Sequence, residues 1–273
     1  KSGSAVDANP TDETTYTAST TFASGTQVGT GNYVVYSGTG NSVNVTGLTL
    51  NTTYYVAVFE YNKGTVNTTE NYYTTVSATG NQTCTNPTYY SQASGDPTTL
   101  SNWNTNRLGG GSTPSNLTTI GTYVIQNGHN LTTTGTVSFG ATGAKLQIED
   151  GGTLTANHAI TIATGATFQI DNGGTYKQNS AIAMSTTIFN GTEVFAANSN
   201  FEITVNPGGT TSPSSPGFGN LTINVTTGSS AFGWSANITQ VQGNLTILGT
   251  GTGTTRHALT SSSSQSLSVG GNL

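Results

Sequence analysis

The side chains with the clearest chemical potential are acidic, and they lie at equivalent positions of two copies of one ten-residue segment. Residues 146–155 read LQIEDGGTLT, and residues 168–177 read FQIDNGGTYK, 22 residues further along. Glu149 and Asp171 are therefore equivalent. In stacked copies their carboxylates would lie about 4.8 Å apart and would repel each other unless solvent or a cation lay between them. Because oxygen ligands suit Ca²⁺, the pair allows a weak calcium site.

The same residues also suit a structural role. Gln126 precedes Glu149 in a looser, earlier copy, and Asp150 falls between Asn127 and Asn172. Asp and Asn before glycine tolerate left-handed backbone and bond to their own turn. Three or fewer charged ligands make a poor calcium cage. We therefore expect turn residues here, and neither a metal site nor a cofactor site.

Catalysis would need more acidic groups in one place. A polysaccharide-cleaving β-helix requires several acids together, as general acid and base or as metal ligands beside a basic residue. Glu149 and Asp150 are neighbours at a strand end, so their side chains are expected to diverge. The repeat region offers as acids and bases Glu149, Asp150, Asp171, Glu193, Glu202, Lys145, Lys177 and Arg256. The sequence holds no Gly-x-Ser-x-Gly elbow and no phosphate-binding loop. We predict no catalytic residues and no enzymatic activity.

The histidines and the cysteine are isolated in the pattern. His129, His158 and His257 do not share a repeat phase, so no common metal edge results and solvated loop positions are expected. Cys84 is the only cysteine. A single cysteine excludes an intrachain disulfide and a cysteine-based zinc site.

The aromatic residues could serve a different purpose. Tyr89, Tyr90 and Trp103 lie close together in the sequence and could form a platform for sugar rings, as could Trp234. Large aromatic side chains more often fill caps and bends, because they bury much apolar area there. We expect the structural role.

Composition excludes several classes of function. Only 6% of the 273 residues are charged, and the net charge of −5 arises from 11 acidic and 6 basic residues. Without a cluster of Lys and Arg, neither nucleic acid nor an anionic membrane surface is an expected partner. No apolar run approaches the roughly 20 residues that span a bilayer. The 12 Tyr, 9 Phe and 36 Gly, set in alternating patterns, indicate an all-β protein.

A fixed repeat of about 22 residues predicts one supersecondary unit stacked on copies of itself. Residues 159–162 and 167–170 are short strand patterns joined by Ala163-Thr-Gly-Ala166, and Ala141-Thr-Gly-Ala144 stands 22 residues earlier. Each repeat is thus two or three short strands between Gly or Asn turns. We predict a parallel β-helix in which Ile148 stacks on Ile170. A series of antiparallel sandwiches is the second choice, and no helix is expected.

A related motif continues the array. Residues 219–223 read GNLTI, residues 243–247 repeat it, and residues 271–273 begin it again. Residues 178–218 are less regular and contain three prolines, so a bulging loop is expected there.

The N-terminal region follows a different pattern. Ser42–Val45 alternates as a short strand, and Gly47 leads into a strand pattern over residues 48–61. One face of that strand would carry, at every second position, Leu48, Leu50, Thr52, Tyr54, Val56 and Val58. This segment resembles the fibronectin type III family, whose pattern Leu-x-Pro-x-Thr-x-Tyr-x-Val-x-Val is matched from Leu48 to Val58 except that Leu50 stands in place of proline. The resemblance implies that Tyr54 is the family's corner tyrosine, whose hydroxyl bonds to upstream backbone.

The match is incomplete. A sandwich of this family has about seven strands, and no credible set for the first three lies upstream of Tyr33–Tyr36. Residues 1–6 look like the exit of a strand whose body precedes Lys1. We expect a fragment of a longer protein, with half of its first domain missing or supplied by another segment and with its last repeat cut at Leu273.

Residues 83–118 connect the two regions. They contain Pro87, Pro97, Pro114 and a Gly109-Gly-Gly-Ser112 run, but also aromatic residues that a free linker would not need. A solenoid needs a cap, because its open end is an unpaired sheet edge. The expected organisation is a partial fibronectin type III-like sandwich over residues 1–82, a linker and cap over 83–118, and β-solenoid repeats over 119–273.

The combination resembles large secreted surface proteins of Bacteroidota, which join fibronectin type III modules to Thr/Asn/Gly-rich β-helical repeats of the Gly-Asn-Leu-Thr-Ile type. The resemblance implies export by the type IX system and a structural or adhesive role at the cell surface. The implied partners are other segments of the same protein, like subunits, or surface glycans. Two alternatives stay open: a subunit of an extracellular filament completed by strand exchange, and a polysaccharide-binding or polysaccharide-cleaving module.

Overall fold

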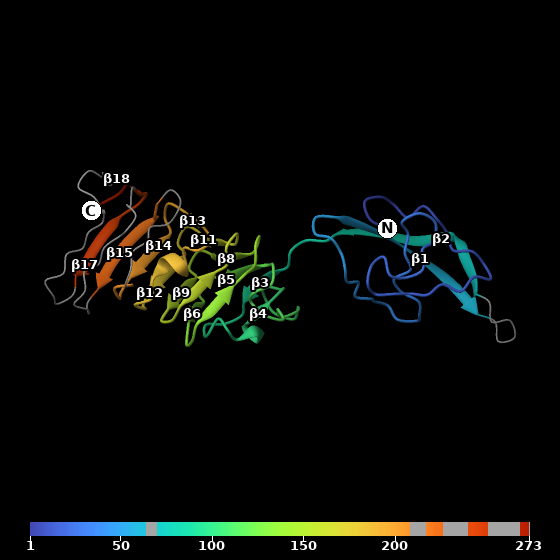
Figure 1. The fold of residues 1–273 in the computed structure, drawn as a ribbon, viewed down its shortest axis with the longest axis horizontal. Helices are drawn as coiled ribbons and strands as arrows, with labels where there is room; N and C mark the ends of the chain where they lie inside the picture. Colours follow the sequence, from blue (N-terminus) through green and yellow to red (C-terminus); the bar gives the residue numbers. More distant parts are fainter. Residues whose placement is uncertain (64–69, 208–216, 226–239, 251–267, 273) are drawn as a thin grey trace. The chain divides into compact units, whose positions relative to one another are not determined.

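The structure is a computed structural model that describes residues 1–63, 70–207, 217–225, 240–250 and 268–272 (Figure 1). The chain divides into two compact units, Lys1–Asn86 and Pro87–Leu273. It is an all-β protein, and its described helical segments are two short 3₁₀ turns, η1 (Leu100–Asn102) and η2 (Met184–Thr186). In the described part of the chain, no helix is long and apolar enough to cross a membrane.

The second unit is a parallel β-solenoid built from three faces. The first face is a six-stranded sheet in the order β13-β11-β8-β5-β3-β4, the second a six-stranded sheet in the order β17-β15-β14-β12-β9-β6, and the third the pair β10-β7. Strands of the first face are β3 (Thr88–Ser91), β4 (Trp103–Asn104), β5 (Thr122–Ile125), β8 (Lys145–Ile148), β11 (Thr167–Ile170) and β13 (Thr192–Phe195). Strands of the second are β6 (Asn130–Thr132), β9 (Thr153–Ala156), β12 (Thr175–Gln178), β14 (Asn200–Ile203), β15 (Asn220–Val225) and β17 (Leu245–Thr250). The third face joins β7 (Val137–Phe139) and β10 (Ile160–Ile162).

The repeat fixes the register between successive turns of the solenoid. Ile125 pairs with Ile148 and Ile148 with Ile170, all three fully buried, so the predicted isoleucine stack is confirmed. Alternate residues of each strand point into the bore and form a continuous buried core. The parallel strands of successive turns lie side by side in Figure 1.

The later Gly-Asn-Leu-Thr-Ile copies also stack as predicted. Leu221 pairs with Leu245 between β15 and β17, and the Asn244 carbonyl accepts the Leu221 amide at 2.9 Å. At the next copy, the Asn272 amide donates to Asn244 Oδ1 at 2.8 Å. Beside this ladder, β16 (Gln240–Val241) pairs in parallel with β18 (Ser268–Val269).

The expected loop over residues 178–218 was wrong for part of its length. Strands β13 and β14 lie within it and pair in parallel with β11 and β12, so the segment contributes another turn of the solenoid. The longest described stretch of this segment without a strand is 179–191, which contains η2, and residues 204–207 and 217–219 also lie outside the strands. Residues 208–216 of this segment lie outside the described residues.

The irregular stretch follows a change in the core. Gln178 occupies a bore position between Ala156 and Ile203 of the adjacent turns. The buried Tyr176 hydroxyl donates to Gln178 Oε1 at 2.5 Å, and Gln178 Nε2 donates to Ser180 Oγ at 2.9 Å. Burial raises the pKa of Tyr176, so the phenol stays neutral. The polar side chain thus holds the following loop against the core.

The first turn of the solenoid is covered by residues 87–118. Strand β3 pairs in parallel with β5 and in antiparallel with β4. Trp103 is fully buried, and its indole N–H donates to the Pro97 carbonyl at 2.8 Å. Its ring meets the edge of Tyr123 with centroids 5.6 Å apart. The segment therefore closes one end of the core with aromatic side chains.

The first unit is held by one long antiparallel pair. Strand β1 (Thr53–Lys63) pairs with β2 (Glu70–Thr83). The predicted strand begins later than residue 48, because Asn51 has a left-handed φ of 57°. Residues 42–45, all described, form no strand. The next residue, Thr46, makes an isolated bridge to Thr21. The Tyr54 hydroxyl accepts the Thr49 amide at 2.8 Å, the upstream backbone contact that the sequence predicts for this tyrosine.

Candidate functional site at the turn row

Three acidic residues of the repeat, Glu149, Asp150 and Asp171, lie on one edge of the solenoid, in a set of equivalent turns that we term the turn row: residues 126–129, 149–152, 171–174 and 196–199. Each turn closes by a bond from its fourth amide to its first carbonyl, at 3.0, 2.9, 3.0 and 2.9 Å. The third residue of the first three turns is a glycine with φ between 70° and 79°. Glycine adopts this conformation without a steric penalty. The shape of these turns is therefore explained by the closing backbone hydrogen bond and, in the first three turns, by the left-handed glycine.

Glu149 is neutralised by an arginine from residues 87–118, which we term the covering segment because they cover the first turn of the solenoid. Arg107 Nη1 and Nη2 donate to the two carboxylate oxygens at 2.9 and 2.5 Å, and the Asn127 amide donates at 2.9 Å. The guanidinium also lies over the Tyr90 ring, 4.5 Å from its centroid. Arg107 and the Asn127 amide lower the pKa of Glu149, although partial burial opposes them. The carboxylate is a structural anion with its charge already paired.

Asp171 is satisfied by amide side chains. Gln147 Nε2 donates to one carboxylate oxygen and Gln169 Nε2 to the other, both at 2.6 Å. Gln169 Oε1 in turn accepts Lys145 Nζ at 3.0 Å. The repulsion expected between the stacked carboxylates is therefore relieved by protein donors from the outer face of the first sheet, without a requirement for a cation.

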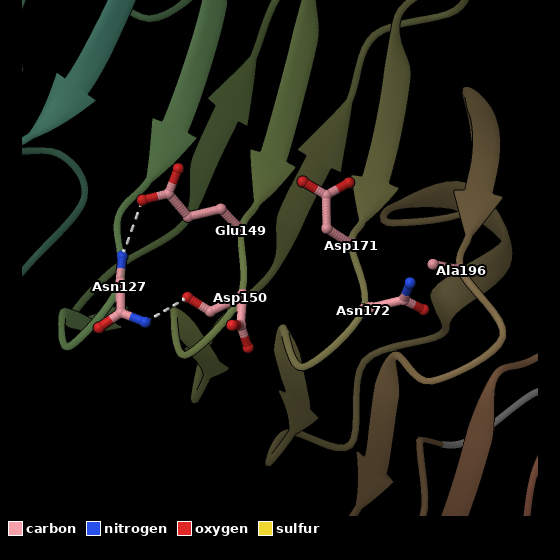
Figure 2. A pocket seen from close by; sticks show the side chains of 6 residues that line it. All are labelled: Asn127, Glu149, Asp150, Asp171, Asn172 and Ala196. Carbon is pink, nitrogen blue, oxygen red and sulfur yellow. Dashed lines mark hydrogen bonds between the residues drawn. The ribbon is translucent and has the colours of Figure 1, made fainter.

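The neighbouring Asn residues bind between turns. Asn127 Nδ2 donates to the Asp150 carbonyl at 2.9 Å, and Asn172 Oδ1 accepts the Asn198 amide at 3.0 Å. The expectation that these side chains would bond to their own turn was wrong in this respect, because the following glycine takes the left-handed position and frees them to reach the next turn. Glu149 and Asp150 diverge as expected (Figure 2).

The turn row borders a shallow hollow of about 480 Å³ on the solenoid surface. Its lining residues are Asn127, Glu149, Asp150, Asp171, Asn172 and Ala196 (Figure 2). Within the described ranges, no group of three or more His, Cys, Asp or Glu side chains is arranged to hold a metal ion. The hollow offers hydrogen-bonding groups and little depth.

The other acids and bases of the repeat are dispersed. Glu193 is buried at a bore position, paired with Phe168 of the preceding turn, whereas Glu202 faces outward and bonds to Lys177 at 3.0 Å. Neither lies in the hollow. Arg256 lies outside the described residues. Glu193 and Glu202 therefore add no carboxylate to the three that line the hollow.

The histidines serve separate contacts. His129 is half-buried, and its Nδ1 lies 2.8 Å from Ser91 Oγ of the covering segment. His158 is exposed, with Nδ1 3.2 Å from the Thr133 carbonyl. His257 lies outside the described residues. The expectation of a solvated loop position thus fits His158 better than His129, which helps to attach the covering segment.

The aromatic candidates fill the covered end. Tyr89 stacks on Tyr123 with centroids 5.4 Å apart, Trp103 is buried, and Tyr90 carries Arg107 on its ring. Trp103 therefore has no exposed ring face, and these contacts cover one ring face of Tyr89 and one of Tyr90. Trp234 lies outside the described residues, and Cys84 is a half-buried free thiol in the first unit.

Two attachments of the covering segment were missed by sequence reasoning: Arg107 and Asp96. Burial opposes ionisation of Asp96, but hydrogen bonds from the hydroxyls and amides of Thr134 and Thr98 outweigh it and lower the pKa to about 2. Asp96 thereby ties the segment to the first turn of the solenoid. Neither contact has a local sequence signal, because the partners are 42 and 38 residues apart.

Comparison with known proteins finds no relative of this chain. No protein-family model matches it, and neither a curated protein nor a solved structure is significantly similar. Functional inference therefore rests on the residues and their geometry.

Proposed function

We propose that this chain is a non-catalytic structural and adhesive segment of an extracellular bacterial surface protein. The observation that carries the proposal is that two carboxylates of the turn row are already bonded to other side chains of the protein. Glu149 is paired with Arg107, and Asp171 accepts from two glutamines. Carboxylates held in this way reinforce stacked turns and are poorly suited to proton transfer.

Stacking of the turns suits a load-bearing role. Backbone bonds join each turn of the turn row to the next, from Gly128 to Gly151 and from Gly151 to Gly173, at 3.1 and 3.3 Å. In a solenoid the stability contributed by such neighbour contacts adds turn by turn. A low content of Lys and Arg also leaves few sites for trypsin-like proteases. Both features favour a durable extracellular spacer.

The outer face of the second sheet suits an adhesive role. Its outward positions carry short polar side chains, among them Thr153, Thr175, Asn200 and Asn220 in successive turns. Hydroxyl and amide groups in regular rows can donate to and accept from the hydroxyls of surface glycans. The proposed partners are therefore glycans and like segments of neighbouring surface proteins.

The finer assignment rests on resemblance. The Gly-Leu-Thr-x-x-Thr-Thr-Tyr-Tyr-Val segment and the Gly-Asn-Leu-Thr-Ile copies support a Bacteroidota surface protein exported by the type IX system. The Tyr54 contact and the antiparallel pair of β1 and β2 support a fibronectin type III-like first unit.

A glycan array combined with a reducing-sugar assay tests the proposal. We expect retention on a subset of glycans and no release of reducing ends. The matched variants are Glu149→Gln and Asp171→Asn, which should leave glycan retention unchanged. If the protein cleaved a polysaccharide and either variant abolished that cleavage, the result would contradict the proposal and favour the enzymatic alternative.

A second candidate function is a filament subunit completed by strand exchange, favoured by the incomplete first unit. Light scattering over a wide concentration range tests it. Concentration-dependent growth beyond a dimer would support filament formation, and a monomer at all concentrations would exclude it.

A further inference from the structure

Three side chains of the first unit meet at one carboxylate. Lys1 Nζ donates a short hydrogen bond to Asp7 Oδ2, and Asn32 Nδ2 donates to the other oxygen, Asp7 Oδ1, at 2.9 Å. The same amide nitrogen also lies 3.4 Å from the Thr30 carbonyl oxygen. A primary amine, a carboxylate and a carboxamide are therefore joined in one chain of hydrogen bonds.

Backbone hydrogen bonds hold the lysine and the asparagine in place. The Lys1 carbonyl accepts the Tyr55 amide of β1 at 2.8 Å, and the Asn32 carbonyl accepts the Val28 amide at 2.8 Å. Lys1 Cε lies 3.8 Å from the position that a Cβ would take on Gly31, the residue directly before Asn32. The lysine side chain therefore runs along the turn that carries the amide, which is the proximity that a reaction between the two groups requires.

Two of the three groups are shielded from water. The Lys1 side chain is 14% exposed and Asn32 is 5% exposed, whereas the Asp7 side chain is 62% exposed. Asn32 Oδ1 is buried and has no hydrogen-bond partner among the described residues. Exclusion of water protects a buried amide from hydrolysis, and the open side at Asp7 gives a small leaving molecule a path to solvent.

We propose that Lys1 and Asn32 form an intramolecular isopeptide bond, with Asp7 as the proton carrier. Lys1 Nζ passes a proton to Asp7 Oδ2 along the existing hydrogen bond, and the neutral amine attacks Asn32 Cγ. Asp7 gives that proton to Asn32 Nδ2, ammonia leaves as the Cγ–Nδ2 bond breaks, and the attacking nitrogen loses its extra proton. The ammonium and the carboxamide thereby become a secondary amide and an ammonium ion, without an oxidant or a co-reactant.

Two other lysines lack part of this arrangement. Lys63 Nζ donates to Glu70 Oε1 at 3.0 Å, but the second oxygen of that carboxylate accepts the Thr15 hydroxyl, which offers no amide to attack. Lys145 Nζ donates to the amide oxygen of Gln169 at 3.0 Å, but Lys145 forms no ion pair within the described ranges, so no carboxylate is placed to take its proton. Neither combines an amine, a proton carrier and a leaving amide.

A covalent link would stabilise a unit whose packing is weak. The described buried residues of the first unit are Asn32 and Glu70, both polar. Small domains that bury too little apolar surface are commonly held by covalent links between distant residues. A bond from Lys1 to Asn32 closes a ring that begins beside β1 and includes the turn at residues 28–32. The bond is independent of the proposed adhesive role.

The test is the intact mass of the whole chain, freshly prepared and after incubation for days. Hydrogen bonds from Lys1 and then Asn32 lower the pKa of Asp7, so the ion pair is the resting state and the bond forms slowly after folding. We expect the incubated protein to weigh about 17 Da less than its sequence, because one ammonia is lost. Cleavage after Glu13 separates residues 1–13 from residues 14–60, so recovery of these two fragments as one linked product locates the bond.

Two variants serve as controls, and circular dichroism checks that both fold. Lys1→Arg keeps a positive charge for the ion pair but has no nucleophilic amine, and Asp7→Ala removes the proton carrier. Both should keep the full sequence mass.

An incubated natural protein at full sequence mass would overturn the inference. A loss of ammonia with separable fragments after cleavage at Glu13 would also overturn it, because an asparagine elsewhere can lose ammonia by closing a ring on its own backbone. The same loss in Lys1→Arg would be equally decisive against it. None of these results bears on glycan retention, so the two proposals can fail separately.

Discussion

Arg107 connects three groups that are distant in sequence: the Glu149 carboxylate, the Gln126 amide and the Tyr90 ring. Arg107→Ala should lower the free energy of unfolding by about 0.5–1 kcal/mol, the range for a half-exposed ion pair, because solvent screens it. Urea denaturation of this variant, Glu149→Gln and the double variant gives the coupling energy. Lys177→Ala, which breaks a similarly exposed pair with Glu202, is the control and should cost less, because Arg107 bonds to both oxygens of its carboxylate. If the stability losses of the Arg107 and Glu149 single variants simply added up in the double variant, the ion pair between these residues would not stabilise the protein.

Asp96 introduces a dependence on pH at the same residue scale. Its folded-state pKa of about 2 lies below the ordinary value of 3.8, so its stabilising contribution is present above about pH 4 and is lost as pH falls towards 2. Because the side chain is partly exposed, we expect about 1 kcal/mol. The measurement is the difference in unfolding free energy between the natural protein and Asp96→Asn at pH 6 and pH 2.5. A difference that persists unchanged at the lower pH would refute this role.

At the scale of the element, the turn row depends on two glycines with different requirements. Gly173 has a φ of 79°, whereas a Cβ at Gly174 would lie 2.6 Å from the Ile148 carbonyl oxygen of the adjacent turn. Gly174→Ala should destabilise the protein by roughly 1–3 kcal/mol, because backbone of two turns must separate. Gly135→Ala is the control, since a Cβ there meets no atom within 4 Å and its φ is not left-handed. Thermal unfolding of both variants checks the difference, and equal midpoints would count against the explanation.

How far the sequence predicts these elements depends on whether their determinants are local. Strand alternation and a shared spacing were sufficient to place Ile148 on Ile170 and Leu221 on Leu245. They were insufficient at β13, where Glu193 replaces an apolar bore residue and hides the pattern, and at Asn51, whose left-handed backbone delays β1. The equivalent positions of Glu149 and Asp171 in adjacent turns were predicted correctly. Their electrostatics were not, because Arg107 reaches Glu149 from 42 residues away.

For the whole molecule, the two units differ in what stabilises them. The described buried apolar side chains all belong to the second unit, where all but Val124 form a single cluster along the bore. Composition predicted β structure in both units but could not distinguish a filled core from an open one, since alternation of apolar residues marks a strand face whether or not another layer covers it.

A solenoid held by neighbour contacts should tolerate loss of a whole turn. Deletion of residues 149–170 removes 22 residues and joins Ile148 to Asp171, so that the following turn takes over the removed one in register. We expect a folded, cooperatively unfolding protein of lower stability, measured by circular dichroism and urea denaturation. Deletion of residues 159–169 removes half that length and puts bore residues on the outer face, so it should abolish cooperative unfolding. If both deletions behaved alike, stability would reside in features other than the stacked repeat, and the additive scaffold on which the proposed function relies would be wrong.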